Sequence, residues 1–91
     1  MRYRAPFTRE QRRVAAREYR LFRDHLRVLQ RRFAPRTEGE AEVLRRYRAH
    51  VQAIRSQLAR DDRQVDANKL NTEFELSKAA VAEYFRVRHF G

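Results

Sequence analysis

The chain contains no cysteine, no tryptophan, and only two glycines and two prolines in 91 residues. Without cysteine it has no disulfide framework, no cysteine-ligated metal site and no thiol nucleophile. So few glycines and prolines leave little material for the tight turns of a multi-stranded β fold. No run of about 18 apolar residues occurs, so no transmembrane segment is expected. These absences favour one small all-α domain.

Lysine is nearly absent as well, because only Lys69 and Lys78 accompany 20 arginines. The formal net charge is +10, and its distribution is uneven. Residues 1–60 hold 17 arginines and six acids, which gives +11, whereas residues 61–91 hold five basic and six acidic residues. A positive charge that is concentrated in one part of the chain indicates an acidic partner: a nucleic acid, an anionic lipid surface or an acidic protein.

The first amphipathic segment is predicted to form a helix over residues 8–33. Thr8 and Gln11 have the spacing of a capping box, and Ala34-Pro35 ends the segment because the residue before proline disfavours the α region. Val14, Leu21 and Val28 widen its apolar face on one side. Spacings of three and four residues define that face, which consists of Ala15, Tyr19, Phe22, Leu26, Leu29 and Phe33.

A second helix is predicted over residues 38–60. Thr37 and Glu40 form another capping-box pattern, and acidic residues crowd the first turn, where the helix dipole favours them. Asp61-Asp62 mark its exit, since carboxylates are unfavourable at a helix C-terminus. Its apolar stripe consists of Leu44, Tyr47, Val51, Ile54 and Leu58.

A third helix is predicted over residues 66–88, with Asp66 as its N-cap and Val65 and Leu70 as a hydrophobic staple. Short connections force neighbouring helices to run antiparallel. We therefore predict an antiparallel, up-down-up three-helix bundle that fills residues 1–91. The stripe of this helix consists of Ala67, Leu70, Phe74, Ser77, Val81 and Tyr84, widened by Leu76, Ala80, Phe85 and Val87.

The sequence shows no constellation for catalysis. His25, His50 and His89 fall one per helix, so no pair at i and i+4 is available for a metal, and no glycine-rich loop is present for a phosphate. An enzyme needs a positioned set of groups. We therefore expect a protein that is not an enzyme and that holds no metal or cofactor directly.

The first helix carries the most informative polar face. Arg13, Arg20 and Arg27 lie seven residues apart, opposite the apolar stripe. Residues 1–36 contain twelve arginines and three acids, and like charges at these spacings weaken a helix. We expect this face to bind an acidic partner, because arginine grips carboxylates and phosphates in a bidentate manner. It is flanked by Arg9, Arg17, Arg23 and Arg31.

The same helix contains the segment Leu21-Phe22-Arg23-Asp24-His25-Leu26-Arg27, and Phe33 follows ten residues after Arg23. This segment resembles the motif of the LYR-motif family of mitochondrial adaptor and accessory proteins. That family has Leu-Tyr-Arg, then x-x-Leu-Arg, and a phenylalanine about ten residues on. Phenylalanine replaces the motif tyrosine. A competing register, Glu18-Tyr19-Arg20, keeps the tyrosine and loses the leucine.

A second, degenerate match lies at the end of the second helix. The family often has Ile-Arg-x-x-Phe-Arg-x-Asn there, followed by a valine and an aspartate that open the third helix. This chain reads Ile54-Arg55-Ser56-Gln57-Leu58-Ala59-Arg60-Asp61 and then Val65-Asp66. Leucine stands where phenylalanine is usual, and the second arginine is one position later. The resemblance covers roughly residues 14–85.

The resemblance implies a non-catalytic adaptor that docks the acyl carrier protein of the mitochondrial matrix. Such adaptors serve as accessory subunits or assembly factors of inner-membrane respiratory or ATP synthase complexes. The residues that carry over for partner binding are Leu21, Phe22, Arg23, Leu26, Arg27, Phe33 and Arg55, beside a basic face of Arg13, Arg17, Arg20 and Arg31.

The resemblance also implies that the acyl-4′-phosphopantetheine of the carrier inserts between the helices. Small residues at Ala15, Ala67, Ser77 and Ala80 are compatible with such a chain, although close helix packing is the better explanation for each of them alone. The residues expected to line the acyl chain are Ala15, Tyr19, Leu29, Val51, Ile54, Phe74 and Val81.

Three alternatives stay open on the sequence alone. A small basic RNA-binding protein of the mitochondrial ribosome would use arginines on phosphates and stack Tyr3, Phe7 or Tyr47 on bases. The basic first helix is also compatible with lying on a membrane surface. A helical scaffold protein without a ligand is the third alternative. The strongly positive surface of this chain argues against it, because a scaffold does not need an excess of one sign of charge. The arginine-rich residues 1–13 are compatible with a retained mitochondrial targeting segment. Glu10 and the scarcity of serine argue against this interpretation.

Overall fold

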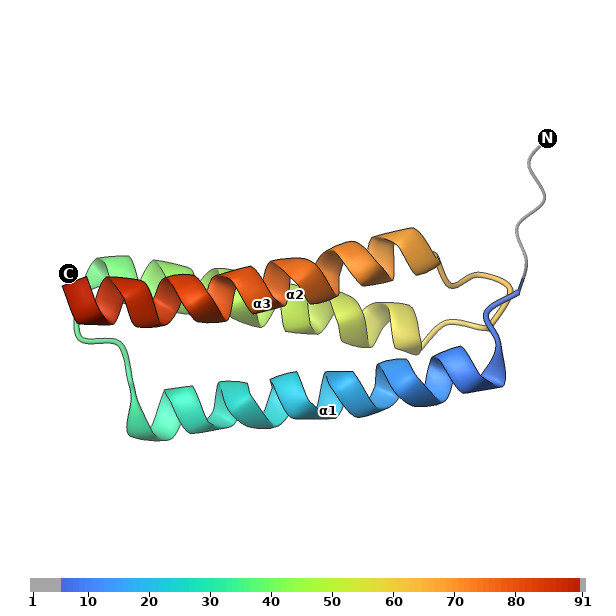
Figure 1. Ribbon diagram of the computed structural model, residues 1–91, viewed down its shortest axis with the longest axis horizontal. Coiled ribbons are helices and arrows are strands. Elements are labelled where there is room, and N and C mark those ends of the chain that lie inside the picture. Colours follow the sequence, from blue (N-terminus) through green and yellow to red (C-terminus); the bar gives the residue numbers. More distant parts are fainter. Residues whose placement is uncertain (1–5, 91) are drawn as a thin grey trace.

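The computed structural model describes residues 6–90 and contains three helices in up-down-up order (Figure 1). They are α1 (Arg9–Arg32), α2 (Glu38–Leu58) and α3 (Ala67–Phe90). No strand occurs within the described residues. The predicted all-α bundle is confirmed, and each helix boundary lies within two residues of its predicted position. No helix in this part of the chain is long and apolar enough to cross a membrane.

The helix starts follow the predicted capping chemistry closely. At α1 the Thr8 side chain accepts the Gln11 amide at 3.0 Å, and the Gln11 side chain accepts the Thr8 amide at 2.8 Å. At α2, Thr37 accepts the Glu40 amide at 3.1 Å, but the Glu40 carboxylate accepts the Arg36 amide and the Thr37 hydroxyl rather than the Thr37 amide. The predicted second capping box is therefore only half formed, because Glu40 is engaged elsewhere.

The third helix begins as predicted. The Asp66 carboxylate accepts the Lys69 amide at 3.1 Å, and Val65 and Leu70 are buried in the same apolar cluster. The Asp66 amide donates to the side-chain oxygen of the buried Gln57, which joins the turn to the end of α2. The cap and the staple together fix the angle at which the chain enters α3.

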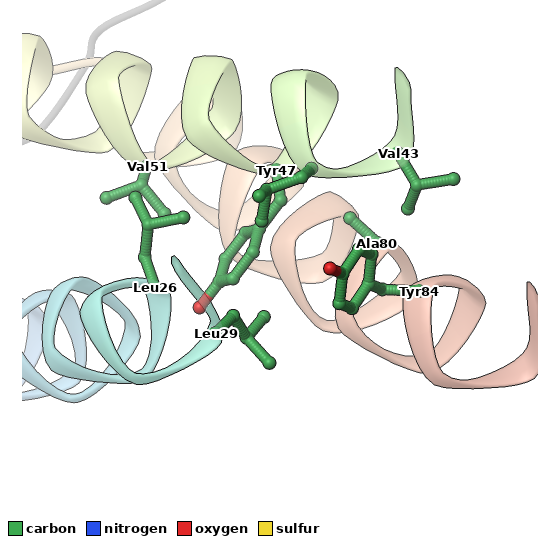
Figure 2. Packing of buried hydrophobic residues seen from close by; sticks show 8 residues of the cluster. Leu26, Leu29, Val43, Tyr47, Val51, Ala80 and Tyr84 are labelled. Atoms are coloured by element: carbon green, nitrogen blue, oxygen red, sulfur yellow. The ribbon is translucent and has the colours of Figure 1, made fainter. Parts of the chain in front are cut away.

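The core consists of two apolar clusters along the bundle, and Tyr19 and Phe22 of α1 pack against both. Helix α2 contacts α1 and α3, whereas α1 approaches α3 less closely. Figure 2 shows Tyr47 of α2 extending toward α1 beside Leu29. Its hydroxyl donates to the carbonyl of Phe22 at 2.8 Å, and burial raises its pKa.

Two arginines fix the ends of α1. Arg12 donates to the Asp62 carboxylate at 2.7 Å and to the carbonyls of Leu58 and Arg60 at 2.6 and 2.8 Å. These acceptors lie at the end of α2 and in the turn that follows it. Each acceptor is otherwise difficult to satisfy at a helix end, so one guanidinium with several donors stabilises the whole turn.

Arg88 of α3 plays the same part at the other end, where α3 finishes beside the connection between α1 and α2 (Figure 1). It donates to the carbonyls of Phe33 and Ala34 at 3.0 and 2.9 Å and to Glu40 at 2.8 Å. The Tyr84 hydroxyl also donates to the Phe33 carbonyl. We call Arg88 and Glu40 the end clamp.

One prediction about the core is wrong. Val14, Leu21 and Val28 were expected to widen the apolar face of the first helix, but they are 43%, 65% and 43% exposed. The reason is that α2 and α3 cover only part of the circumference of α1, and these three residues lie beyond the covered part. Leu76 and Phe85 of α3 are likewise exposed.

Candidate partner-binding face of the first helix

The arginines predicted to form a basic face lie on the surface of α1. Arg13, Arg20 and Arg27 are exposed, as are Arg17 and Arg31. Arg13 has one long contact with Glu10 at 3.7 Å, and Arg27 has one with Asp24 at 3.8 Å. Both pairs are exposed, so each contributes little stability.

The remaining arginines of this face are free to meet a partner. Within residues 6–90, Arg17, Arg20 and Arg31 make no ion pair. Their positive charge is therefore not neutralised by the fold. A row of uncompensated guanidinium groups attracts carboxylates or phosphates of a partner.

The motif residues divide between the core and the surface. Phe22 is half-buried, with its ring centroid 6.3 Å from Tyr47 and 6.0 Å from Phe74. Leu26 is buried, as expected, whereas Leu21 is exposed. The Phe22 ring thus packs against both apolar clusters.

The motif arginines differ from each other in their surroundings. Arg23 is half-buried, lies 5.9 Å above the ring of Tyr19 and pairs with Asp24 at 3.2 Å. Arg27 projects into solvent. Arg55 is exposed on α2. Arg27 is therefore the more accessible of the two motif arginines.

Phe33 lies at the end of α1 rather than in the core. Its ring packs edge-on against Phe85 at 5.9 Å and lies under Arg88 at 5.6 Å. It is partly exposed, because α1 ends one residue before it and the chain turns away. Phe33 therefore belongs with the end clamp.

Two of the seven residues expected to line an acyl chain border a groove. This groove has a volume of about 280 Å³ and lies between the N-terminal halves of α1 and α3. Ala15 and Phe74 line it, together with the apolar side chains of Phe7, Val14 and Leu70. Glu10 and Glu18 supply carboxylates to the same groove.

The other expected lining residues lie in the closed core. Leu29 and Ile54 have no exposed surface, and Val51 is buried, while Tyr19 and Val81 are half-buried against the core clusters. The prediction from sequence missed Phe7, although it directly precedes the N-cap, where a hydrophobic residue often packs against the helix.

The histidines make separate contacts with other side chains. His50 lies 2.7 Å from the Glu73 carboxylate and links α2 to α3, and His25 packs near Tyr47 and Phe85. No group of metal-ligating side chains is found in residues 6–90.

The structure also corrects the expectation of base-stacking aromatics. Phe7 and Tyr47 are buried in the core, so neither is available to stack on a nucleobase. Tyr3 lies outside the described residues, as do residues 1–5 of the segment considered for targeting.

No protein-family model, no curated protein and no solved structure matches this chain.

Proposed function

We propose that this protein is a non-catalytic LYR-type adaptor of the mitochondrial matrix that docks acyl carrier protein. In this role it is an accessory subunit or assembly factor of an inner-membrane respiratory or ATP synthase complex. The observation that carries the proposal is the row of exposed arginines on α1, several of which make no ion pair with any residue between positions 6 and 90. The motif resemblance supplies the identity of the acidic partner.

The electrostatics of α1 support such a partner. Complementary charge across an interface accelerates encounter and sets orientation more than it adds affinity. Arg20 and Arg27 lie on one line of the helix and both face solvent, so an acidic helix of a carrier can contact them together. Guanidinium groups suit this role because each binds a carboxylate through two hydrogen bonds.

The acyl group of the carrier enters, in this proposal, through the groove between α1 and α3. Its volume of about 280 Å³ is near the lower end of ligand sites, which run from about 300 to 1,000 Å³. Phe74 borders the groove and also contacts Phe22 of the core. A longer acyl chain therefore has to displace this pair of rings to reach the closed core.

The uncompensated arginines also suit the phosphates of RNA, which keeps an RNA-binding protein of the mitochondrial ribosome as the second candidate. The burial of Phe7 and Tyr47 leaves this candidate without the two described aromatics expected to stack on bases. Phosphate contacts alone position a protein on RNA without reading its sequence.

The test is calorimetric titration with purified, acylated acyl carrier protein at 0.15 M salt. Arg20→Glu/Arg27→Glu should weaken binding at least tenfold while far-UV circular dichroism stays unchanged. The matched control is Arg63→Glu/Arg86→Glu, which reverses two exposed charges outside α1 and should bind within twofold of wild type. Equal losses in both variants, or no binding by wild type, would overturn the proposal.

The same variants separate the RNA candidate. RNA binding that is tighter than carrier binding, with affinity falling steeply as salt rises, would replace the adaptor function. Arg23→Glu serves as a separate probe of the motif. Because Arg23 packs over Tyr19, the helix content of the Arg23→Glu variant is measured together with its affinity for the carrier.

A further inference from the structure

The exposed apolar residues of α1 form a regular row. Val14, Leu21 and Val28 are seven residues apart, so they lie along one line of the helix. Leu21, at the centre, is 65% exposed and is the most exposed of the three. We call these residues the apolar row. All three side chains keep a solvent-exposed surface within residues 6–90.

Charged residues flank the apolar row in a repeating order. Glu10, Arg17, Asp24 and Arg31 are also spaced by seven residues, and their signs alternate. Each lies three or four positions from a residue of the row, which makes it a direct neighbour on the helix surface. The four charges sum to zero, in contrast to the strongly positive remainder of α1.

This order of charges is antisymmetric about Leu21. If a second copy of α1 lies antiparallel across the row, with a two-fold axis at Leu21, then Val14 meets Val28 of that copy. In the same arrangement Glu10 faces Arg31 of the copy, and Arg17 faces Asp24 of the copy. A parallel arrangement would instead place like charges together, which is unfavourable.

On the other side of the apolar row, the residues that face each other across the two-fold axis are also complementary. Glu18 lies beside the row on the side toward α3, and its partner across the axis is His25 of the second copy. Phe85 of α3 is exposed and lies 6.3 Å from His25, so it extends the apolar surface of this side. A two-fold interface uses the same patch on both subunits, as this pattern requires.

We infer that the chain associates with a second copy of itself, α1 against α1, antiparallel and centred on Leu21. The patch excludes Arg13, Arg20 and Arg27, but Arg17 and Arg31 belong to the basic face, and Glu10, Val14 and Glu18 border the groove. Self-association therefore competes with carrier docking on α1. The evidence for self-association is the order of apolar and charged residues, which does not depend on the motif resemblance. Each copy carries +10, which opposes association until salt screens the charge. At about 0.15 M the screening length is about 8 Å, and the contact itself is charge-balanced.

Sedimentation velocity of the whole chain from 1 to 500 μM, at 0.15 M salt, tests the inference. The mass should rise with concentration from 11.1 kDa toward twice that value. Leu21→Lys places two like charges on the axis and should weaken association at least tenfold. Leu76→Lys, which changes an exposed leucine of α3, is the matched control and should leave it unchanged.

The charge pattern has a sharper test. Arg17→Asp and Asp24→Arg should each weaken self-association about fivefold or more, because each juxtaposes two like-charged pairs. Mixing the two single variants should restore association to within about twofold of wild type, since both contacts in the mixed pair are then attractive. Circular dichroism of each variant confirms that the helices are retained.

Several results would overturn the inference. Wild type that stays monomeric at 500 μM, a mixture that fails to associate, or equal losses from Leu21→Lys and Leu76→Lys each contradict it. A monomer whose Leu21 becomes protected only on anionic vesicles would assign the row to a membrane surface instead. Wild type that stays monomeric but still binds the carrier refutes this inference and leaves the acyl-carrier proposal standing.

Discussion

The end clamp gives the most demanding prediction about stability. Glu40 is 2% exposed, and its nearest cation is Arg88, which is 16% exposed, at 2.8 Å. Arg88→Met removes that cation together with the hydrogen bonds to the carbonyls of Phe33 and Ala34. The Glu40 carboxylate then retains only the exposed Arg36, 3.8 Å away, and its hydrogen bonds with the Arg36 amide and the Thr37 hydroxyl.

The size of the effect follows from burial. Breaking a buried ion pair by removing one partner costs about 3–5 kcal/mol, because the other charge stays buried without compensation. Arg36 still offsets part of this cost, and Arg88 keeps some contact with water, so we expect the lower end, about 3 kcal/mol. That is a large part of the total stability of a small domain, which is about 5–15 kcal/mol.

Urea denaturation followed by circular dichroism at 222 nm measures this free energy of unfolding. The double variant Glu40→Gln/Arg88→Met should be more stable than Arg88→Met alone by about 1 kcal/mol or more, because it no longer buries an unpaired charge. A loss below about 1 kcal/mol for Arg88→Met, or a double variant less stable than the single one, would refute the reasoning.

Three further predictions concern the same measurement. Burial raises the pKa of Tyr47 above its ordinary value, so its neutral form contributes stability that is present below about pH 10 and declines as the pH rises further. Tyr47→Phe should flatten this decline between pH 9 and 11.5, and an unchanged slope would contradict it. Gly39→Ala should raise the free energy of unfolding by about 0.5 kcal/mol, since the added Cβ meets Val87 at an ordinary 3.8 Å; a loss of stability would show that the contact is too tight. Arg12→Lys should cost about 1–2 kcal/mol, because an ammonium group cannot reproduce three separately directed hydrogen bonds; stability equal to wild type would mean that charge alone suffices.

Much of the fold could be predicted from local patterns. The Thr8–Gln11 capping box and the Asp66 N-cap depend on residues three positions apart, so the sequence alone predicts them. The apolar stripes likewise identify core residues such as Leu29 and Tyr84. Local spacing determines these features, and the structure confirms them.

Other features depend on which elements meet in three dimensions. Arg12 and Arg88 are two of 20 arginines, and only the packing of the helix ends shows that they bind carbonyls and carboxylates some 50 residues away. The apolar row was predicted to join the core, because the periodicity of apolar residues does not show how much of a helix its neighbours cover. Leu21 is exposed because α2 and α3 cover only part of the circumference of α1.

The candidate site was predicted in part. Helical spacing placed Arg13, Arg20 and Arg27 on one exposed face, which the structure confirms. The groove was not predicted, because it forms where Phe7 and the start of α3 approach α1. Which partner meets the arginine face stays a prediction based on the motif resemblance.

The most direct test of the central claim is co-expression of the chain with mitochondrial acyl carrier protein, followed by native mass spectrometry. The adaptor function predicts a 1:1 complex whose carrier bears an acylated 4′-phosphopantetheine, and loss of that complex in Arg20→Glu/Arg27→Glu. Recovery of the chain without carrier, with acylated carrier present in excess, would contradict the account.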